Sequence, residues 1–341
     1  MAGNVYGLDL GTYEIKIYDK KKNKIWREKN AVALKDKTQF FAAGNKAYDI
    51  YEKEPADIEV VFPMQDGVIA RFGDMQHLLG SLLGSGRPLI GGARYVIAVP
   101  TDVTEVEKKA FYDLVVHSEA RARSVRIVER GLADAIGCGI DVMEEKGVFI
   151  VNLGGDTTEL SVLSRGGMVM SRLLKTGGHD FDMAIVLLVR RKAEFLIGNT
   201  TAEMMRRTFG LSGYRGSREI RVSGRDLITG VPSQKEIPAG LVRAAMKGTL
   251  RMYVRAVRAM LERTPPDVRK VIEDRGIFLT GGMSAMRGID EYFRKHTGLP
   301  VTTADRPQFC AVRGLRKIIS EKNYYKQLTY SMDGEKYRWL R

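Results

Sequence analysis

Three glycine-containing turns, each beside an apolar run, give this chain its clearest chemical signal. They lie at residues 9–12, 152–158 and 279–282, near the start, the middle and the end of the sequence. Backbone N–H groups in such turns form concave anion sites, and glycine is needed where a Cβ would block a phosphate oxygen. Three turns in this order predict two similar lobes that hold one nucleotide between them.

The strand pattern around the first two turns is repeated. Residues 5–10 and 15–18 read as two strands joined by the first turn. Residues 148–152 and 160–163 repeat the same strand–turn–strand unit around the second turn. This internal similarity favours a duplicated fold.

Strands and helices alternate along the rest of the chain. Thr101 or Thr104 is expected to begin a helix toward residue 117, because Glu105 and Glu107 would lie at its positive end. Other strands are expected at 94–100, 125–128 and 276–280, other helices at 74–84, 131–138, 180–195, 200–208 and 241–263, and small inserts at 31–62 and 210–240.

Size and composition restrict the classes of protein. The chain has 341 residues, of which 44% are hydrophobic, which suffices for two lobes of ordinary size. No apolar stretch approaches the ~18 residues of a membrane span, and no secretory signal is visible. Cys138 and Cys310 lack metal-type spacing and read as core residues of a reducing compartment. We therefore expect a cytoplasmic protein.

The formal net charge of +14 is high for an enzyme of small molecules. It indicates contact with a membrane surface, a nucleic acid or an acidic protein. A solvated basic surface without a specific partner is the alternative. Nucleic acid is not expected, because no recognised binding module occurs in the sequence.

Longer motifs carry a resemblance to a known family. The sequence resembles actin-fold ATPases and, within that superfamily of actins, heat-shock chaperones and sugar kinases, the MreB-like bacterial actins of the rod-shape system. The resemblance runs from about residue 4 to residue 315. Its motifs lie at 7–12, 63–70, 99–108, 224–230, 264–266 and 275–282.

The resemblance implies an α/β, actin-like fold. Two duplicated lobes, each with a mixed β-sheet flanked by helices, would enclose a nucleotide cleft. The expected division is a lobe I core at 1–30, 63–145 and 305–341 with an insert at 31–62, and a lobe II core at 146–179 and 240–304 with an insert at 180–239.

The resemblance also implies the cofactors ATP or ADP and Mg²⁺. Phosphate loops would lie at 9–16 and 152–158, with the metal held through water by Asp9 and Asn152. Lys16 would contact phosphate, although on an alternating strand it is also simply an exposed cation. The implied nucleotide contacts are Asp9, Gly11, Thr12, Tyr13, Lys16, Asn152, Gly154, Gly155, Asp156, Thr157, Gly178, Glu203, Arg206, Gly281, Gly282 and Met283.

Two family motifs are altered. The family pattern Glu-Pro-Met-Ala-Ala-Ala-Ile-Gly reads Arg-Gly-Leu-Ala-Asp-Ala-Ile-Gly at 130–137, so the glutamate that orients the attacking water becomes Arg130. The pattern Asp-Ile-Gly-Gly-Gly-Thr-Thr reads Asn-Leu-Gly-Gly-Asp-Thr-Thr at 152–158. Asn152 thus replaces a carboxylate that helps to hold Mg²⁺, and Asp156 replaces a glycine that faces phosphate.

These changes predict weak hydrolysis by an actin-type ATPase, because phosphoryl transfer depends on positioned water and compensated charge. Arg130 is expected to pair with Asp156 across the cleft or to clamp the γ-phosphate directly. In the alternative, the loops shift by one residue and Glu129 becomes the catalytic group. A neighbour on an extended strand points to the other face, which argues against Glu129.

The family implies filaments, formed by head-to-tail contacts that do not close. Membrane contact is expected through Leu89 and Ile90 in the loop at 86–92, on the inner face of the cell membrane. The aromatic and basic tail at 320–341 suits a membrane interface or a partner equally well. The expected partners are copies of the chain itself, the membrane surface, other MreB paralogues and cell-wall elongation proteins.

Three functions fit these features. The first is a cytoskeletal protein whose membrane-associated filaments guide cell-wall synthesis and cell shape. The second is a regulatory pseudo-ATPase that caps or co-assembles with a conventional MreB, which the changes at Arg130, Asn152 and Asp156 favour. The third is a sugar-kinase-like enzyme, which the MreB-specific motifs and the lack of a substrate-binding domain disfavour.

Overall fold

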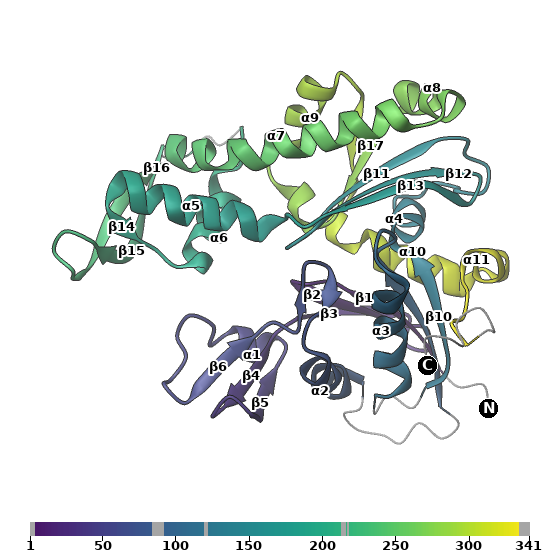
Figure 1. Ribbon diagram of the computed structural model, residues 1–341, viewed down its shortest axis with the longest axis horizontal. Helices are drawn as coiled ribbons and strands as arrows, with labels where there is room; N and C mark the ends of the chain where they lie inside the picture. The colour runs from purple at the N-terminus through teal and green to yellow at the C-terminus, as the bar shows by residue number, and fades with distance from the viewer. Residues whose placement is uncertain (1–3, 84–91, 119–121, 213–215, 217, 334–341) are drawn as a thin grey trace.

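Two lobes, each built around a five-stranded β-sheet, make up the molecule in the computed structural model (Figure 1). The structure describes the chain except for residues 1–3, 84–91, 119–121, 213–215, 217 and 334–341. Leu89 and Ile90, the expected membrane contacts, lie outside the described residues. Among the residues described, no helix is both long enough and apolar enough to cross a bilayer.

The lobe I sheet has the strand order β10-β9-β1-β2-β3. Strands β1, β2 and β3 form an antiparallel meander, whereas β9 and β10 run parallel to β1. The strand bounds are β1 (Val5–Leu10), β2 (Glu14–Asp19), β3 (Lys24–Lys29), β9 (Ala93–Val99) and β10 (Ala122–Glu129).

The lobe II sheet repeats this topology in the order β13-β12-β11-β17-β18. Its first three strands again form an antiparallel meander, and β17 and β18 again run parallel to the first strand. The internal repeat predicted from the sequence is therefore confirmed as a duplicated fold. The strand bounds are β11 (Val148–Leu153), β12 (Thr158–Ser164), β13 (Gly167–Leu174), β17 (Ile277–Thr280) and β18 (Val301–Thr303).

Helices of lobe I begin where the sequence signals place them. Thr104, not Thr101, caps the helix that follows β9: its hydroxyl accepts a hydrogen bond from the N–H of Glu107, and the Glu107 carboxylate accepts one from the N–H of Thr104. The helix bounds in this lobe are α2 (Phe72–Leu83), α3 (Glu105–Val116), α4 (Arg130–Gly137), α10 (Cys310–Ser320) and α11 (Lys322–Leu328).

Helices α4 and α10 cross at very short range because two glycines face the partner backbone. A Cβ on Gly137 would lie 1.9 Å from the carbonyl oxygen of Cys310, and one on Gly314 would lie 1.8 Å from that of Ala133. Cys138 and Cys310 meet at this crossing with their sulfur atoms 3.9 Å apart, which agrees with their predicted role in the core. The crossing fixes the first residue of α4 beside the end of β1.

Each lobe carries an insert with a three-stranded sheet, and both inserts lie at the left in Figure 1. The exact limits of the four parts of the chain stay a prediction. The insert of lobe I contains β4 (Val32–Lys35), β5 (Gln39–Ala43), α1 (Asn45–Tyr48) and β6 (Ile58–Val61), and is followed by the short hairpin of β7 (Met64–Gln65) and β8 (Val68–Ile69). The sheet of the lobe II insert comprises β14 (Phe195–Leu196), β15 (Glu219–Asp226) and β16 (Pro232–Pro238).

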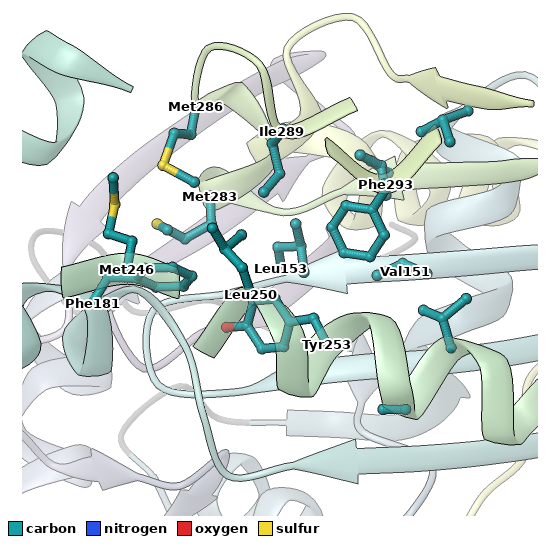
Figure 2. Close-up of a cluster of buried hydrophobic side chains, with 14 of the residues drawn as sticks. Val151, Leu153, Phe181, Met246, Leu250, Tyr253, Met283, Met286, Ile289 and Phe293 are labelled. Carbon is teal, nitrogen blue, oxygen red and sulfur yellow. The ribbon is translucent and has the colours of Figure 1, made fainter. Parts of the chain in front are cut away.

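The core of lobe II forms one wall of the space between the lobes. Phe181, Leu250 and Tyr253 pack with Leu153 and Met283 in this core (Figure 2). Met283 belongs to a short 3₁₀ turn that follows β17, so the core holds that turn in place. The helix bounds are α5 (Gly178–Ala193), α6 (Asn199–Phe209), α7 (Ala239–Arg263), α8 (Pro266–Arg275) and α9 (Ile289–Thr297), with 3₁₀ turns η1 (Gly282–Ala285) and η2 (Pro307–Phe309).

The described part of the C-terminal tail packs on lobe I. Tyr324 of α11 is buried, and Tyr330 forms an antiparallel bridge with Ile127 of β10. Tyr324 therefore does not belong to the exposed interfacial surface considered for the tail, and Tyr330 is half-buried against lobe I. Tyr337 and Trp339 lie outside the described residues.

Candidate functional site

A cavity of about 660 Å³ lies between the two lobes, within the usual range of small-molecule sites. Its lining includes every residue that the resemblance assigned to the nucleotide, from Asp9 to Met283, together with Arg130. The lining comes from the β1–β2 turn, the β11–β12 turn, the first turns of α4 and α5, helix α6 and the residues after β17. The three glycine turns thus converge on one cavity.

The first two glycine turns have a close backbone contact at the equivalent glycine. A Cβ on Gly11 would lie 2.7 Å from the carbonyl oxygen of Glu14, and a Cβ on Gly154 would lie 2.7 Å from that of Thr157. Both distances are too short for any side chain, so both positions require glycine. The third turn has Gly281 at φ +83°, a backbone conformation that also favours glycine.

Arg130, the first residue of α4, is buried where the first two glycine turns line the cavity, the phosphate end expected from the resemblance. Its Nη2 donates a hydrogen bond to the carbonyl oxygen of Leu10 at 3.2 Å. Its Nε lies 3.8 Å from Oδ1 of Asp9, and its Nη1 lies 3.8 Å from Oε2 of Glu159. A single guanidinium thus links the ends of β1 and α4 to β12 in the other lobe.

The expected pair of Arg130 with Asp156 is not formed. Among the described residues, the ion-pair partners of Arg130 are Asp9 and Glu159, because the side chain turns toward β1 and β12. Asp156 lines the same cavity, and burial raises the pKa of its carboxyl group, with His179 opposing that shift. Burial therefore favours the neutral form of Asp156.

Glu129 points away from the cavity. Its carboxylate lies 3.9 Å from Nζ of Lys108 and accepts a hydrogen bond from the Tyr330 hydroxyl at 3.3 Å. It does not line the cavity, whereas its neighbour Arg130 does. The alternation of side chains along an extended strand explains the difference, and this geometry does not favour Glu129 as a substitute catalytic group.

Asn152 is tied to a buried carboxyl group on the opposite lobe. Its Nδ2 donates a hydrogen bond of 2.6 Å to Oδ2 of Asp134, which lies one turn after Arg130 on α4. Burial raises the pKa of Asp134 to about 7, and the hydrogen bond from Asn152 opposes that shift. The carboxylate that the family carries on β11 is thus found here on α4, where the family pattern has alanine.

The residues at the phosphate end do not fit a hydrated Mg²⁺ ion. The two carboxylate oxygens of Asp9 face Lys16 at 3.7 Å and Arg130 at 3.8 Å, so protein cations already neutralise the expected metal partner. Asn152 uses its amide as a donor toward Asp134. Among the described residues, no group of three or more His, Cys, Asp or Glu side chains could hold a metal ion. Mg²⁺ prefers charged oxygen ligands, and both carboxylate oxygens of Asp9 already face protein cations.

The part of the cavity lined by α5, α6 and the turn after β17 is built from paired charges. Nε and Nη2 of Arg206 donate to the two carboxylate oxygens of Asp182 at 2.6 and 3.0 Å, which fixes the guanidinium beside Met283. Burial raises the pKa of Asp182, and the hydrogen bond from Arg206 opposes that shift. This bidentate pair gives α5 and α6 a rigid wall on the cavity.

Side chains also cross between the lobes near α6. The hydroxyl of Tyr13 donates to Glu203, and the ammonium group of Lys29 lies 3.5 Å from the centre of the Tyr13 ring. Glu52 of the lobe I insert accepts hydrogen bonds from the backbone N–H groups of Asn199 and Thr200, the first residues of α6. Glu52 thus joins the lobe I insert to α6, and Tyr13 joins the β1–β2 turn to the same helix.

Several site residues were not anticipated from the sequence, among them Asp134, Glu159, Asp182 and Glu52. The sequence did contain a signal for Asp134, because this ionisable residue replaces an alanine of the family pattern. Asp182 and Glu52 carry no comparable signal, because an acidic residue on a surface-type helix or turn is usually solvated. Their roles depend on contacts between elements distant in the sequence.

The chain is similar to known proteins over nearly its whole length. The family model described as MreB/Mbl protein matches residues 3–327. The cell shape-determining protein MreB of Escherichia coli (strain K12) is 36% identical over 327 residues, which cover 92% of each chain. The cell shape-determining protein Mbl of Bacillus subtilis (strain 168) is 32% identical over 314 residues, which cover 90% of this chain and 93% of Mbl.

Solved structures show the same arrangement of elements. The crystal structure of MreB5 of Spiroplasma citri bound to AMPPNP matches with a TM-score of 0.89 at 32% identity, covering 96% of this chain and 98% of MreB5. The ADP-bound form of MreB5 matches with a TM-score of 0.88. A MamK double helical filament matches with a TM-score of 0.77 at 19% identity, which bears on the fold alone. The fold is therefore actin-like.

Proposed function

The chain belongs to the MreB/Mbl family of actin-like, cell shape-determining proteins, and from this we propose that it binds ATP or ADP between its lobes and polymerises into filaments. In this proposal the filaments lie on the inner face of the cell membrane and guide cell-wall synthesis. Weak hydrolysis of ATP is part of the proposal.

The observation that carries nucleotide binding is the convergence of the three glycine turns on one cavity of about 660 Å³. Glycines in equivalent positions of the two turns, Gly11 and Gly154, face it from opposite lobes, as expected for two loops that share a chain of phosphates. The MreB5 relative is described with AMPPNP and with ADP, which supports the same ligand class here.

Weak hydrolysis is supported by the groups around the phosphate end. The position of the family glutamate holds Arg130, a cation that cannot accept a proton from water. Glu129 faces Lys108 instead of the cavity. Without a carboxylate to orient the attacking water, the rate of phosphoryl transfer to water should be strongly reduced.

A second candidate is a regulatory pseudo-ATPase that caps or co-assembles with a conventional MreB. The specific observation in its favour is that the altered residues contact protein groups across the cavity: Arg130 lies near Glu159, and Asn152 donates to Asp134. Contacts of this kind between the lobes suit a subunit that remains closed and does not cycle through hydrolysis.

Electron microscopy and sedimentation of the purified chain, with and without ATP, would test filament formation. Mixing with a conventional MreB separates the two candidates. Filaments of the chain alone support the first, whereas incorporation or capping only in the mixture supports the second. A chain that neither polymerises alone nor alters the filaments of a partner contradicts both.

A further inference from the structure

Two protein cations flank one carboxylate at the phosphate end of the cavity. Asp9 has Lys16 at 3.7 Å on one oxygen and Arg130 at 3.8 Å on the other. All three residues are buried and line the cavity. Lys16 and Arg130 are therefore fixed cations at the cavity, and Arg130 also lies 3.8 Å from Oε2 of Glu159.

Arg130 also has an unused donor. Its Nε is buried and makes no hydrogen bond within the part of the chain that the structure describes, since Oδ1 of Asp9 lies too far away. A buried donor without a partner is costly, so such a group marks the place of a missing acceptor. A guanidinium fork matches the oxygens of a phosphate group, which makes phosphate the fitting acceptor.

A divalent cation would compete unfavourably for the same place. Coulomb repulsion from Lys16 and Arg130 opposes its entry, and Asp9 is already compensated by these two cations. Asn152 offers only a neutral amide oxygen in place of a carboxylate, because its amide nitrogen donates to Asp134. A hydrated Mg²⁺ ion normally supplies phosphate with positive charge and with hydrogen-bond donors from its bound water. Lys16 and Arg130 supply both here.

We infer that the guanidinium of Arg130, with the ammonium of Lys16, takes the place of a divalent cation, so that this chain binds ATP or ADP without metal. The inference rests on the proposed nucleotide binding and adds that this binding requires no metal ion. It also assigns Arg130 to the phosphate groups of the ligand.

The test is calorimetric titration of the nucleotide-free chain with ATP, once in EDTA and once in Mg²⁺. We expect dissociation constants that agree within about threefold. Elemental analysis of the complex formed in Mg²⁺ and then desalted should give well below one metal ion per nucleotide. A tenfold or greater loss of affinity in EDTA, or a stoichiometric metal ion, would overturn the inference and leave nucleotide binding intact.

Variants locate the effect at Arg130. Arg130→Glu combined with Asp134→Ala and Asn152→Asp restores the family residues and should make binding metal-dependent, by about tenfold or more between the two buffers. Arg126→Gln is the matched control, because Arg126 lies on β10 and bonds to Thr329 outside the cavity. For Arg126→Gln, the ratio of the dissociation constants for ATP in EDTA and in Mg²⁺ should equal that of the wild type. Absence of ATP binding in both buffers would instead overturn the proposed function together with this inference.

Discussion

The hydroxyl of Tyr13 in lobe I donates to both carboxylate oxygens of Glu203 in lobe II, at 2.8 and 3.1 Å. Burial, followed by the charge of Glu203, raises the pKa of Tyr13, so the hydroxyl keeps its proton and remains a donor. The two residues are 190 positions apart in the sequence and come from facing walls of the cavity. The contact therefore joins the two lobes across the cavity.

Removing this hydroxyl should loosen the closed arrangement. In Tyr13→Phe the carboxylate of Glu203 loses a partly buried, charge-assisted hydrogen bond, worth about 1 to 2 kcal/mol. We expect a larger radius of gyration for the nucleotide-free variant in small-angle scattering. Adding Glu52→Ala, which removes the contact with the start of α6, should increase the opening further.

Tyr18→Phe is the matched control for this variant. The Tyr18 hydroxyl donates to Asn23 within lobe I at 3.4 Å and spans no cavity. Its loss should leave the radius of gyration unchanged. Equal scattering profiles for the wild type and Tyr13→Phe would show that the Tyr13–Glu203 contact does not hold the lobes together.

Asp134 and Asn152 should behave as a coupled pair. Asn152→Asp alone would place two carboxyl groups at hydrogen-bond distance in a buried site and should destabilise the fold by about 3 kcal/mol. Adding Asp134→Ala, the family residue at that position, should recover most of the loss. A double-mutant cycle on thermal midpoints measures the coupling. If the effects of the two substitutions on the thermal midpoint are additive, Asp134 and Asn152 are not coupled.

These contacts show where sequence reasoning succeeded and where it stopped. The sheets and turns were predictable, because apolar periodicity and glycine are local properties of residues such as Gly11 and Gly154. The partners of Arg130 were not, since Glu159 becomes its neighbour only when the second lobe folds against the first. Tyr13 and Glu203 were both assigned to the nucleotide, yet their mutual hydrogen bond depends on how far the cavity closes.

Asp134 should give stability a distinctive dependence on pH. Burial raises its pKa to about 7 from an ordinary value of 3.8, so between these values the folded chain holds a proton that the unfolded chain has lost. Its stabilising contribution is complete below the unfolded pKa and is lost as pH rises through the folded pKa. The thermal midpoint should therefore fall more for the wild type than for Asp134→Asn between about pH 5 and pH 8. Parallel profiles would refute this assignment.

The crossing of α4 and α10 should tolerate no side chain at Gly314. A methyl group there would meet the Ala133 carbonyl at 1.8 Å, so Gly314→Ala should force the helices apart and lower the thermal midpoint strongly. Gly248→Ala in α7 is the control, because nothing lies within 4 Å of its Cβ position. That change should be neutral or stabilise by about 0.5 to 1 kcal/mol. Equal effects of the two substitutions would exclude a close helix contact.

Hydrolysis should be recoverable by restoring the family residues together. Arg130→Glu alone would place a carboxylate beside Asp9 and Glu159, so it should be combined with Asp134→Ala and Asn152→Asp. We expect steady-state phosphate release in Mg²⁺ to rise by roughly tenfold or more in this triple variant, because a carboxylate can again orient and deprotonate water. Arg130→Gln in the same background removes the cation without restoring the carboxylate and should remain slow. If the wild type already releases phosphate as fast as the triple variant, Arg130 does not impair hydrolysis.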